Sequence, residues 1–307
     1  MKIKRREFLK QSAIGVGGLI AGAQLASAAE SGTATGAVAP QFHDPFTLVP
    51  LGKSGLKFTR VCMGTGSHGG KRESNQTRKG RTAFQTLLRD AYDRGVRTFD
   101  LADLYGTHTY LPPALAGCPR DSYSLISKIW WNRGGIPEPE RPAADVVVDR
   151  FLKELKTDHI DLLLLHCVTD ADWPTQLRPQ MEILSQLKAQ GKIRALGVSC
   201  HSLEALEAAA EPWVESVHTR INPYGMSMDG PPETVVPLLQ KLHTAGKGVI
   251  GMKIIGEGRL RNDDTRRDES VRYALGLGCV HILNVGFEKA EEIDDFATRV
   301  RKVPLTA

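Results

Sequence analysis

The segment from Pro142 to His166 reads PAADVVVDRFLKELKTDHIDLLLLH, and its pattern decides the fold. Its first part, 142–156, places apolar residues three and four positions apart, which is the spacing of an amphipathic helix. Its last part, Ile160–His166, is apolar almost throughout, which is typical of a strand buried on both faces. Helices alternating with such strands are typical of parallel sheets whose faces are covered by helices.

The same alternation runs through the rest of the chain. Strands are predicted at 60–63, 97–101, 123–128, 160–166, 193–198, 216–221, 248–253 and 280–285. Helices are predicted near 82–94, 111–117, 142–156, 176–190, 202–211, 233–245, 264–276 and 289–302. No linker interrupts the series. The chain that follows residue 28 is close in length to the ~250 residues of one barrel. The sequence therefore predicts one α/β domain, a (β/α)8 TIM barrel, rather than an open doubly wound sheet.

The first 28 residues have the pattern of an export signal. KRREFLK at 4–10 is basic, an apolar run follows at 13–25, and ASA at 26–28 has the small residues of a cleavage site. The paired arginines point to the twin-arginine export machinery as a partner. An uncleaved anchor is disfavoured because the run is shorter than the roughly 20 residues of a membrane span. We expect a signal peptide at 1–28, a flexible leader at 29–46 and the barrel at 47–307, in a periplasmic or otherwise exported protein that has no membrane contact after cleavage.

Charge and cysteine content exclude two classes of protein. Residues 1–28 hold five Lys or Arg and one acidic residue, so they carry +4 of the total net charge of +5. The nearly neutral remainder gives no basis for binding to nucleic acid or to a membrane surface. The cysteines form no CxxC pair and are odd in number, so no structural disulfide is predicted: they are Cys62, Cys118, Cys167, Cys200 and Cys279.

Polar residues stand at the ends of three successive predicted strands. Asp100 and Tyr105 follow the second strand, Lys128 ends the third and His166 ends the fourth. The C-terminal ends of barrel strands and the loops after them form the active site. Each residue alone has a structural explanation, such as a strand cap or a packed loop aromatic. The four together at these positions indicate a catalytic site.

Here the chain resembles the aldo-keto reductase superfamily, whose second strand reads Phe-Asp-Thr-Ala-x-x-Tyr-Gly. This chain has FDLADLYG at 99–106, and the segments 51–56, 157–162 and 190–199 are similar as well. The resemblance extends from about residue 48 to 300. It implies an NAD(P)-dependent oxidoreductase that interconverts an alcohol and the carbonyl of a small aldehyde, ketone or sugar by hydride transfer.

The resemblance assigns the family's catalytic tetrad to the same four residues. Reduction of a carbonyl requires a proton on its oxygen, and Tyr105 is expected to be the general acid and base. The pKa of free tyrosine is near 10, and the ammonium of Lys128 is expected to lower it. Asp100 would hold Lys128 charged and in place. His166 would donate a hydrogen bond to the substrate oxygen.

The resemblance also implies NADPH or NADH as cofactor, with its phosphates at the loop after the seventh strand and at the last helix. The expected contacts are Gly64, Thr65, Ser199, Tyr224, Lys253, Gly256, Gly258, Leu260, Gly286, Glu288 and Lys289. Tyr224 would stack on the nicotinamide, and backbone N–H groups at the start of the last helix would bind a phosphate. The GxGxxG stretch at 64–69 is interpreted as a barrel loop near the nicotinamide, because residues 70–80 look irregular where a Rossmann helix would begin.

Three departures from the family pattern leave the choice between NAD and NADP open. Glu288 stands where many members have a Ser or Arg that contacts the 2′-phosphate, and its carboxylate would suit a free 2′-hydroxyl better. Phe296 replaces an asparagine on the adenine side. Cys200 replaces the asparagine of a Ser-Asn pair after the fifth strand.

Candidates for substrate contact are weaker. Trp130 and Trp131 could stack on a flat or sugar-like substrate. Arg220 could bind an anionic group. Packing at the barrel rim and a salt bridge explain these residues equally well. No metal is expected, because the histidines near the strand ends lack a motif such as HExxH; these are His68, His108, His166 and His201.

Two further functions stay open at this point. The barrel could be a non-catalytic binding module, as potassium-channel β subunits resemble reductases yet serve a channel. The tetrad could also serve non-redox or internally redox-neutral sugar chemistry. A substrate-dependent change in nicotinamide absorbance separates the redox hypothesis from both.

Overall fold

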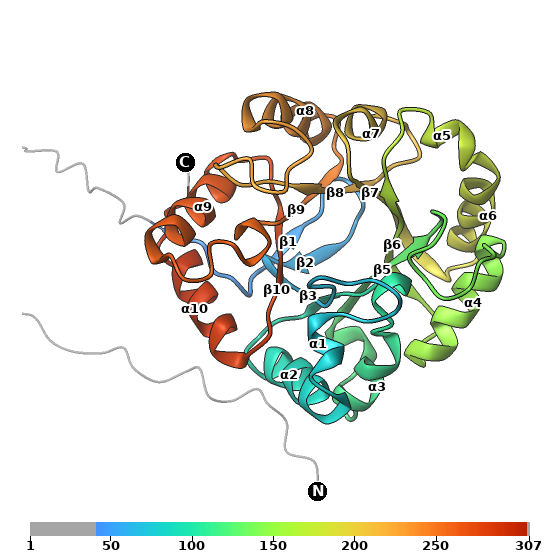
Figure 1. The fold of residues 1–307 in the computed structure, drawn as a ribbon, viewed down its shortest axis with the longest axis horizontal. Helices are drawn as coiled ribbons and strands as arrows, with labels where there is room; N and C mark the ends of the chain where they lie inside the picture. The colour runs from blue at the N-terminus through green and yellow to red at the C-terminus, as the bar shows by residue number, and fades with distance from the viewer. Residues whose placement is uncertain (1–40, 306–307) are drawn as a thin grey trace, which may run out of the picture. The chain divides into compact units, whose positions relative to one another are not determined.

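A computed structural model describes residues 41–305 and confirms the predicted barrel. Eight parallel strands close in the order β10-β3-β4-β5-β6-β7-β8-β9 (Figure 1). Their bounds are β3 (Val61–Gly64), β4 (Thr98–Asp100), β5 (Ser124–Trp130), β6 (Ile160–Val168), β7 (Ile193–Cys200), β8 (Ser216–Arg220), β9 (Gly248–Met252) and β10 (Ile282–Gly286). Each strand pairs with its sequence neighbours, as expected for strand–helix units repeated in one direction.

Helices surround the strands on the outside of the barrel (Figure 1). The main ones are α2 (Arg81–Asp93), α3 (Leu111–Ala114), α4 (Ala144–Leu155), α6 (Arg178–Ala189), α7 (Leu203–Ala208), α8 (Pro232–Thr244), α9 (Asp264–Gly276) and α10 (Ala290–Val300). Short turns add α1 (Asn75–Arg78), α5 (Trp173–Gln176), η1 (Asp103–Tyr105), η2 (His108–Tyr110), η3 (Arg120–Ser122) and η4 (Gly256–Gly258). The predicted helices near 111–117 and 202–211 are therefore shorter than expected.

A hairpin closes the N-terminal mouth of the barrel. It consists of β1 (Leu48–Pro50) and β2 (Lys57–Thr59), which pair antiparallel. Leu51, in the turn, packs against Gly248 at the start of β9 and belongs to an apolar cluster of inward-facing strand residues. Because this end is filled with apolar side chains, only the C-terminal mouth can hold a polar site.

The last part of the predicted leader belongs to the folded domain, which corrects the boundary at residue 46. His43 N–H donates to Val303 O at 3.0 Å, and Val61 N–H donates to Pro45 O at 2.8 Å. These bonds join the chain before β1 to β3 and to the C-terminal segment. The export signal and residues 29–40 lie outside the described residues.

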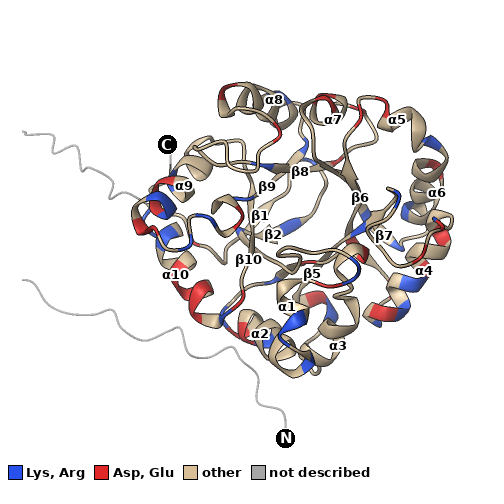
Figure 2. Cartoon of the chain, viewed as in Figure 1, with Lys and Arg blue, Asp and Glu red and all other residues tan. Residues whose placement is uncertain are grey.

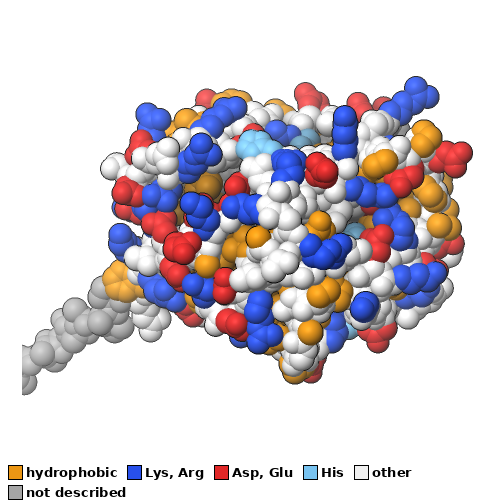
Figure 3. Space-filling model, turned by 60° about the horizontal axis from the view of Figure 1, so that its bottom comes forward, with side chains coloured by type: hydrophobic (Ala, Val, Ile, Leu, Met, Phe, Trp, Pro, Cys, Tyr) orange, Lys and Arg blue, Asp and Glu red, His pale blue; other side chains and the backbone are white. Residues whose placement is uncertain are grey.

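Residues 41–305 were also expected to lack disulfides, a membrane span and a strongly basic surface. All five cysteines have free thiols. None of the helices in this range combines the length and apolar character needed to cross a bilayer. Lys, Arg, Asp and Glu alternate along the outer helices in Figure 2 and over the face displayed in Figure 3, as expected for a nearly neutral domain.

Candidate active site

The four predicted catalytic residues meet at the C-terminal mouth of the barrel. Lys128 Nζ, on β5, donates to Asp100 Oδ1 at 2.5 Å and to Leu101 O at 3.0 Å. The hydroxyl of Tyr105, in η1, lies 3.2 Å from Nε2 of His166 on β6. Nζ of Lys128 lies 5.2 Å from the centre of the Tyr105 ring. The strand ends thus bring together residues 66 positions apart in the chain, from Asp100 to His166.

Two residues that the sequence analysis missed complete the surroundings of Asp100. Asn284 Nδ2, on β10, donates to Asp100 Oδ2 at 2.5 Å, and His218 Nε2, on β8, lies 3.6 Å from Asp100 Oδ1. Burial alone would raise the pKa of Asp100, but the ammonium of Lys128 and the ring of His218 outweigh it and hold the pKa well below its usual range. A signal was present for Asn284, a polar residue inside the otherwise apolar β10, but not for His218, because β8 reads SVHTR and is largely polar.

The pKa of Tyr105 is raised, so the expectation that Lys128 lowers it is wrong for this form of the protein. Burial raises this pKa most, and the carboxylate of Asp100 adds to the effect. Lys128 donates to Asp100, and its Nζ lies 5.2 Å from the centre of the Tyr105 ring. Tyr105 is therefore a neutral phenol with a proton to donate.

His166 is neutral as well. Burial lowers its pKa well below the usual value, and the positive charge of Lys128 adds to the effect. Its Nδ1 has no partner among the described residues, whereas Nε2 faces Tyr105. The pairing of β6 with β7 shifts register between Leu165 and Val168, and Cys167 has a φ of 56°. Irregularities of this kind turn side chains toward a site at a barrel rim.

Two glycines of the GxGxxG stretch provide the seat of the Tyr105 ring. A Cβ atom on Gly66 would come within 2.6 Å of three ring atoms, and one on Gly69 would lie 2.5 Å from the ring. No extended helix opens directly from this stretch, since α1 covers only Asn75–Arg78. The loop is therefore a barrel loop, as predicted, and its glycines allow Tyr105 to pack against the backbone.

A cleft of about 250 Å³ begins at Tyr105 and Asp100 and ends at the first turn of α10. Five of the predicted cofactor contacts line it: Gly64, Lys253, Gly258, Gly286 and Glu288. The sequence analysis had not assigned other lining residues, which include Asn75, Met252, Arg261, Arg267, Asn284, Glu292 and Asp295. The cleft connects the proton donor to the end of the barrel where β10 leads into α10.

Four predicted contacts lie beside the cleft rather than on it. The hydroxyl of Thr65 is buried and donates to Asp100 O at 2.8 Å. Ser199 is also buried, and its hydroxyl has no partner among residues 41–305. Leu260 is a buried residue of the loop after β9, and Gly256 takes a φ of 59° in the same loop. These four residues lie beside the cleft and do not line it.

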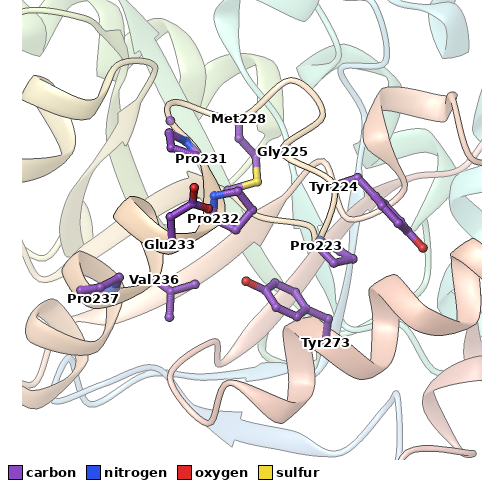
Figure 4. A pocket seen from close by; sticks show the side chains of 11 residues that line it. Pro223, Tyr224, Gly225, Met228, Pro231, Pro232, Glu233, Val236, Pro237 and Tyr273 are labelled. Atoms are coloured by element: carbon purple, nitrogen blue, oxygen red, sulfur yellow. The ribbon is translucent and has the colours of Figure 1, made fainter.

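Tyr224 and Lys289 do not lie where expected. Tyr224 lines a separate groove with Pro223, Met228 and Tyr273, and Figure 4 shows its hydroxyl directed away from the other lining residues. That hydroxyl donates to the carboxylate of Glu269 at 2.5 Å. The expected stacking of Tyr224 on a nicotinamide is therefore not supported. Lys289 is exposed at the start of α10 and does not line the cleft.

The predicted substrate contacts Trp130, Trp131 and Arg220 mainly pack or pair with other residues of the protein. Trp130 Nε1 donates to Gly134 O at 2.6 Å, and its ring meets the ring of His166 edge to face with centres 5.5 Å apart. Trp131 is partly buried against the outer core. Arg220 forms an ion pair with the buried Asp229 at 3.1 Å, which is the rim salt bridge considered above. Trp130 thus contacts one tetrad residue, His166.

The residues of the cleft fit a nicotinamide dinucleotide in their chemistry. Lys253 and Arg261 could bind a diphosphate, and Gly258 allows close approach of a ligand. Lys253 Nζ currently pairs with Glu257 Oε1 at 2.5 Å. The volume is slightly below the roughly 300–1,000 Å³ of typical small-molecule sites. A bound dinucleotide would thus extend along the open part of the cleft.

The start of α10 offers fewer free phosphate donors than expected. The backbone N–H groups of Glu288 and Lys289 donate to Glu292 Oε2 at 2.7 and 3.2 Å. Two of the expected phosphate donors at the start of α10 are therefore already engaged. Within residues 41–305, no three His, Cys, Asp or Glu side chains are arranged to hold a metal ion.

Comparison with known proteins identifies the family. Residues 60–300 match the Aldo/keto reductase family. The chain is 28% identical over 236 residues to the aldo-keto reductase YhdN of Bacillus subtilis, covering 71% of this chain and 68% of that protein. It is 25% identical over 169 residues to the NADH-specific methylglyoxal reductase of Escherichia coli, covering 49% of this chain and 51% of that protein.

Solved structures share the fold. The holo form of the aldo-keto reductase AKR11C1 from Bacillus halodurans superimposes with a TM-score of 0.66 at 22% identity, covering 85% of this chain and 93% of that chain. The family match spans the barrel strands and every residue of the tetrad. The chain therefore belongs to the aldo/keto reductase family and is an oxidoreductase that interconverts carbonyls and alcohols with NAD(P).

Proposed function

We propose that this protein is an exported reductase of small aldehydes or ketones, with Tyr105 as its proton donor. The observation that carries the proposal is the 3.2 Å separation of the Tyr105 hydroxyl and His166 Nε2, next to the buried Lys128–Asp100 pair. The relative named as a methylglyoxal reductase makes small 2-oxoaldehydes the first substrates to test, ahead of sugar carbonyls.

In this mechanism, the hydride for the carbonyl carbon would come from NADH or NADPH held in the cleft, and the chain's own residues handle the proton. Tyr105 gives its proton to the carbonyl oxygen, because its raised pKa keeps it a phenol until charge develops on that oxygen. His166, with its proton on Nε2, donates a hydrogen bond to the same oxygen. Lys128 stabilises the phenolate that remains, and Asp100 holds Lys128 in place.

The cofactor would be held by Lys253, Arg261 and Gly258 along the cleft. Export by the twin-arginine route belongs to the proposal and is supported by the motif at residues 4–10. Free nicotinamide nucleotides are scarce outside the cytoplasm. A route that carries folded protein would let the cofactor leave already bound, to be recycled between two substrates.

Replacing Tyr105 with phenylalanine tests the mechanism. Turnover of methylglyoxal should fall by about 10²–10⁴-fold, the usual contribution of a general acid, while binding of the dinucleotide stays unchanged. Tyr224→Phe is the matched control, because it removes the same hydroxyl from a tyrosine outside the cleft. Full turnover by Tyr105→Phe would refute the role of Tyr105. If the wild-type protein bound no nucleotide and showed no turnover, a binding module would be the better description.

A further inference from the structure

The two ends of the cleft differ in charge and in what they can recognise. The inner end holds Tyr105 and the carboxamide of Asn284, beside the buried Lys128–Asp100 pair. The outer end holds three acidic side chains, Glu288, Glu292 and Asp295. An elongated cofactor that presents its hydride donor to Tyr105 must place its other end among these carboxylates.

The N-terminus of α10 would ordinarily attract an anion at this outer end, because its first backbone N–H groups lack partners within the helix. Here Glu292, in the first turn, folds back so that its Oε2 accepts from the N–H groups of Glu288 and Lys289 at 2.7 and 3.2 Å. A carboxylate of the chain itself thus binds two of the N–H groups that an anion at this helix start would use. A phosphate that used these N–H groups would have to displace the Glu292 carboxylate, and the two negative charges would repel each other.

The other groups at this end leave little positive charge for a phosphate. Glu288 Oε1 accepts from Asn75 Nδ2 at 2.7 Å, which holds a second carboxylate at the wall of the cleft. Arg267 lines the cleft, but it pairs with Asp295 at 2.7 Å and with Asp264. Arg261 is a lining cation without a carboxylate partner in the described part of the chain, and it comes from the loop after β9 rather than from α10.

We propose that Glu292 makes the cleft select a dinucleotide with a free 2′-hydroxyl, NADH, over its 2′-phosphorylated counterpart, NADPH. The inference rests on the proposed function, since it assumes that the cleft binds a nicotinamide dinucleotide. The diphosphate is common to both cofactors, so Lys253 and Arg261 attract them equally. The acidic outer end accepts a ribose hydroxyl as a hydrogen-bond donor and repels a phosphate. Figure 2 shows the acidic residues of α10 gathered in its first turns.

The test is the ratio of the dissociation constants for NADPH and NADH, measured on the full-length protein by quenching of tryptophan fluorescence. We expect wild type to bind NADH at least about tenfold more tightly. Glu292→Ala should lower the ratio by about tenfold, because it removes one charge and frees two N–H donors for a charge-assisted hydrogen bond. Glu292→Gln should lower it as well, while keeping an oxygen that caps the helix.

Glu291→Ala is the matched control, since Glu291 lies in the same first turn but does not line the cleft. It should leave the ratio unchanged, and Arg261→Ala should weaken both cofactors alike. A wild type that binds NADPH as tightly as NADH overturns the inference and leaves the proposed function standing. So does a ratio that Glu292→Ala does not change. If neither dinucleotide binds, the proposed function fails and the inference fails with it.

Discussion

Replacing Lys128 with methionine should destabilise the barrel as well as stop turnover. The side chain of Lys128 is fully buried and that of Asp100 is 4% exposed, so the substitution leaves a buried carboxylate with Asn284 and His218 as its partners. Methionine has a similar length, so little of the effect comes from a cavity. Removal of one member of a buried ion pair costs about 3–5 kcal/mol, and we expect the free energy of unfolding to fall by that amount.

Urea unfolding at pH 7 measures this effect, with the double variant Asp100→Asn/Lys128→Met as its control. The double variant removes both charges, so it should recover most of the lost stability. Turnover should be lost in both variants, since neither retains the ammonium beside Tyr105. If Lys128→Met lay within about 1 kcal/mol of wild type, or if the double variant were no more stable than the single one, the buried pair would not have the electrostatic role argued here.

The pH dependence provides a second measurement on the same variants. Because the pKa of Asp100 is depressed in the folded protein, its contribution to stability is present above the unfolded value near 3.9 and is lost as pH falls toward the depressed pKa. The difference between wild type and Lys128→Met should therefore be largest near neutrality and should shrink below about pH 4. A difference that is constant with pH would contradict this assignment of charges.

Two further predictions concern the loop after β3 and the rim. Gly66→Ala should lower the free energy of unfolding by about 1–3 kcal/mol and reduce turnover, since a Cβ there overlaps the ring of Tyr105. Gly70→Ala, in the same loop with open space around the new Cβ, should behave like wild type in urea unfolding and steady-state kinetics, and equal effects of both would contradict the seat proposed for Tyr105. Burial raises the pKa of Asp229 to about 6 despite Arg220, above the unfolded value near 3.9, so this carboxyl destabilises the fold as it ionises. Wild type should thus lose stability relative to Asp229→Asn as pH rises from about 4 to 7, and thermal unfolding across that range would show a constant difference if this were wrong.

The barrel and the tetrad could be predicted from the sequence because both follow from local pattern. Segments such as Ile160–Val168 are apolar apart from Asp161 and His166, which is typical of strands covered on both sides. Once the strands are placed, chain topology requires that their C-terminal ends meet at one mouth. Asp100, Lys128 and His166 stand at strand ends, and their proximity is a consequence of strand position alone.

Two kinds of feature could not be predicted: the direction of side chains in loops, and pKa values that several neighbouring groups determine together. Tyr224 follows β8 closely in the sequence, yet its loop turns the hydroxyl toward Glu269. The pKa of Tyr105 is raised by burial and by the carboxylate of Asp100, which an argument from Tyr105 and Lys128 alone leaves out. Glu292 caps α10 through a side chain inside the helix, at a position where an acidic residue is common in any first turn.

The buried charges of the site, Asp100 and Lys128, lie on barrel strands, whereas Tyr105, the group that transfers the proton, lies in a loop. Asp100 is held by residues on three other strands, Lys128, His218 and Asn284, so its position is set by the barrel. Tyr105 lies in η1 and owes its position to loop glycines and to His166. A substrate that contacts Tyr105 and His166 can therefore adjust the phenol without disturbing the buried charges. The same division explains why Lys128 can hold its pairing with Asp100 in the free protein and still stabilise a phenolate when the proton leaves Tyr105.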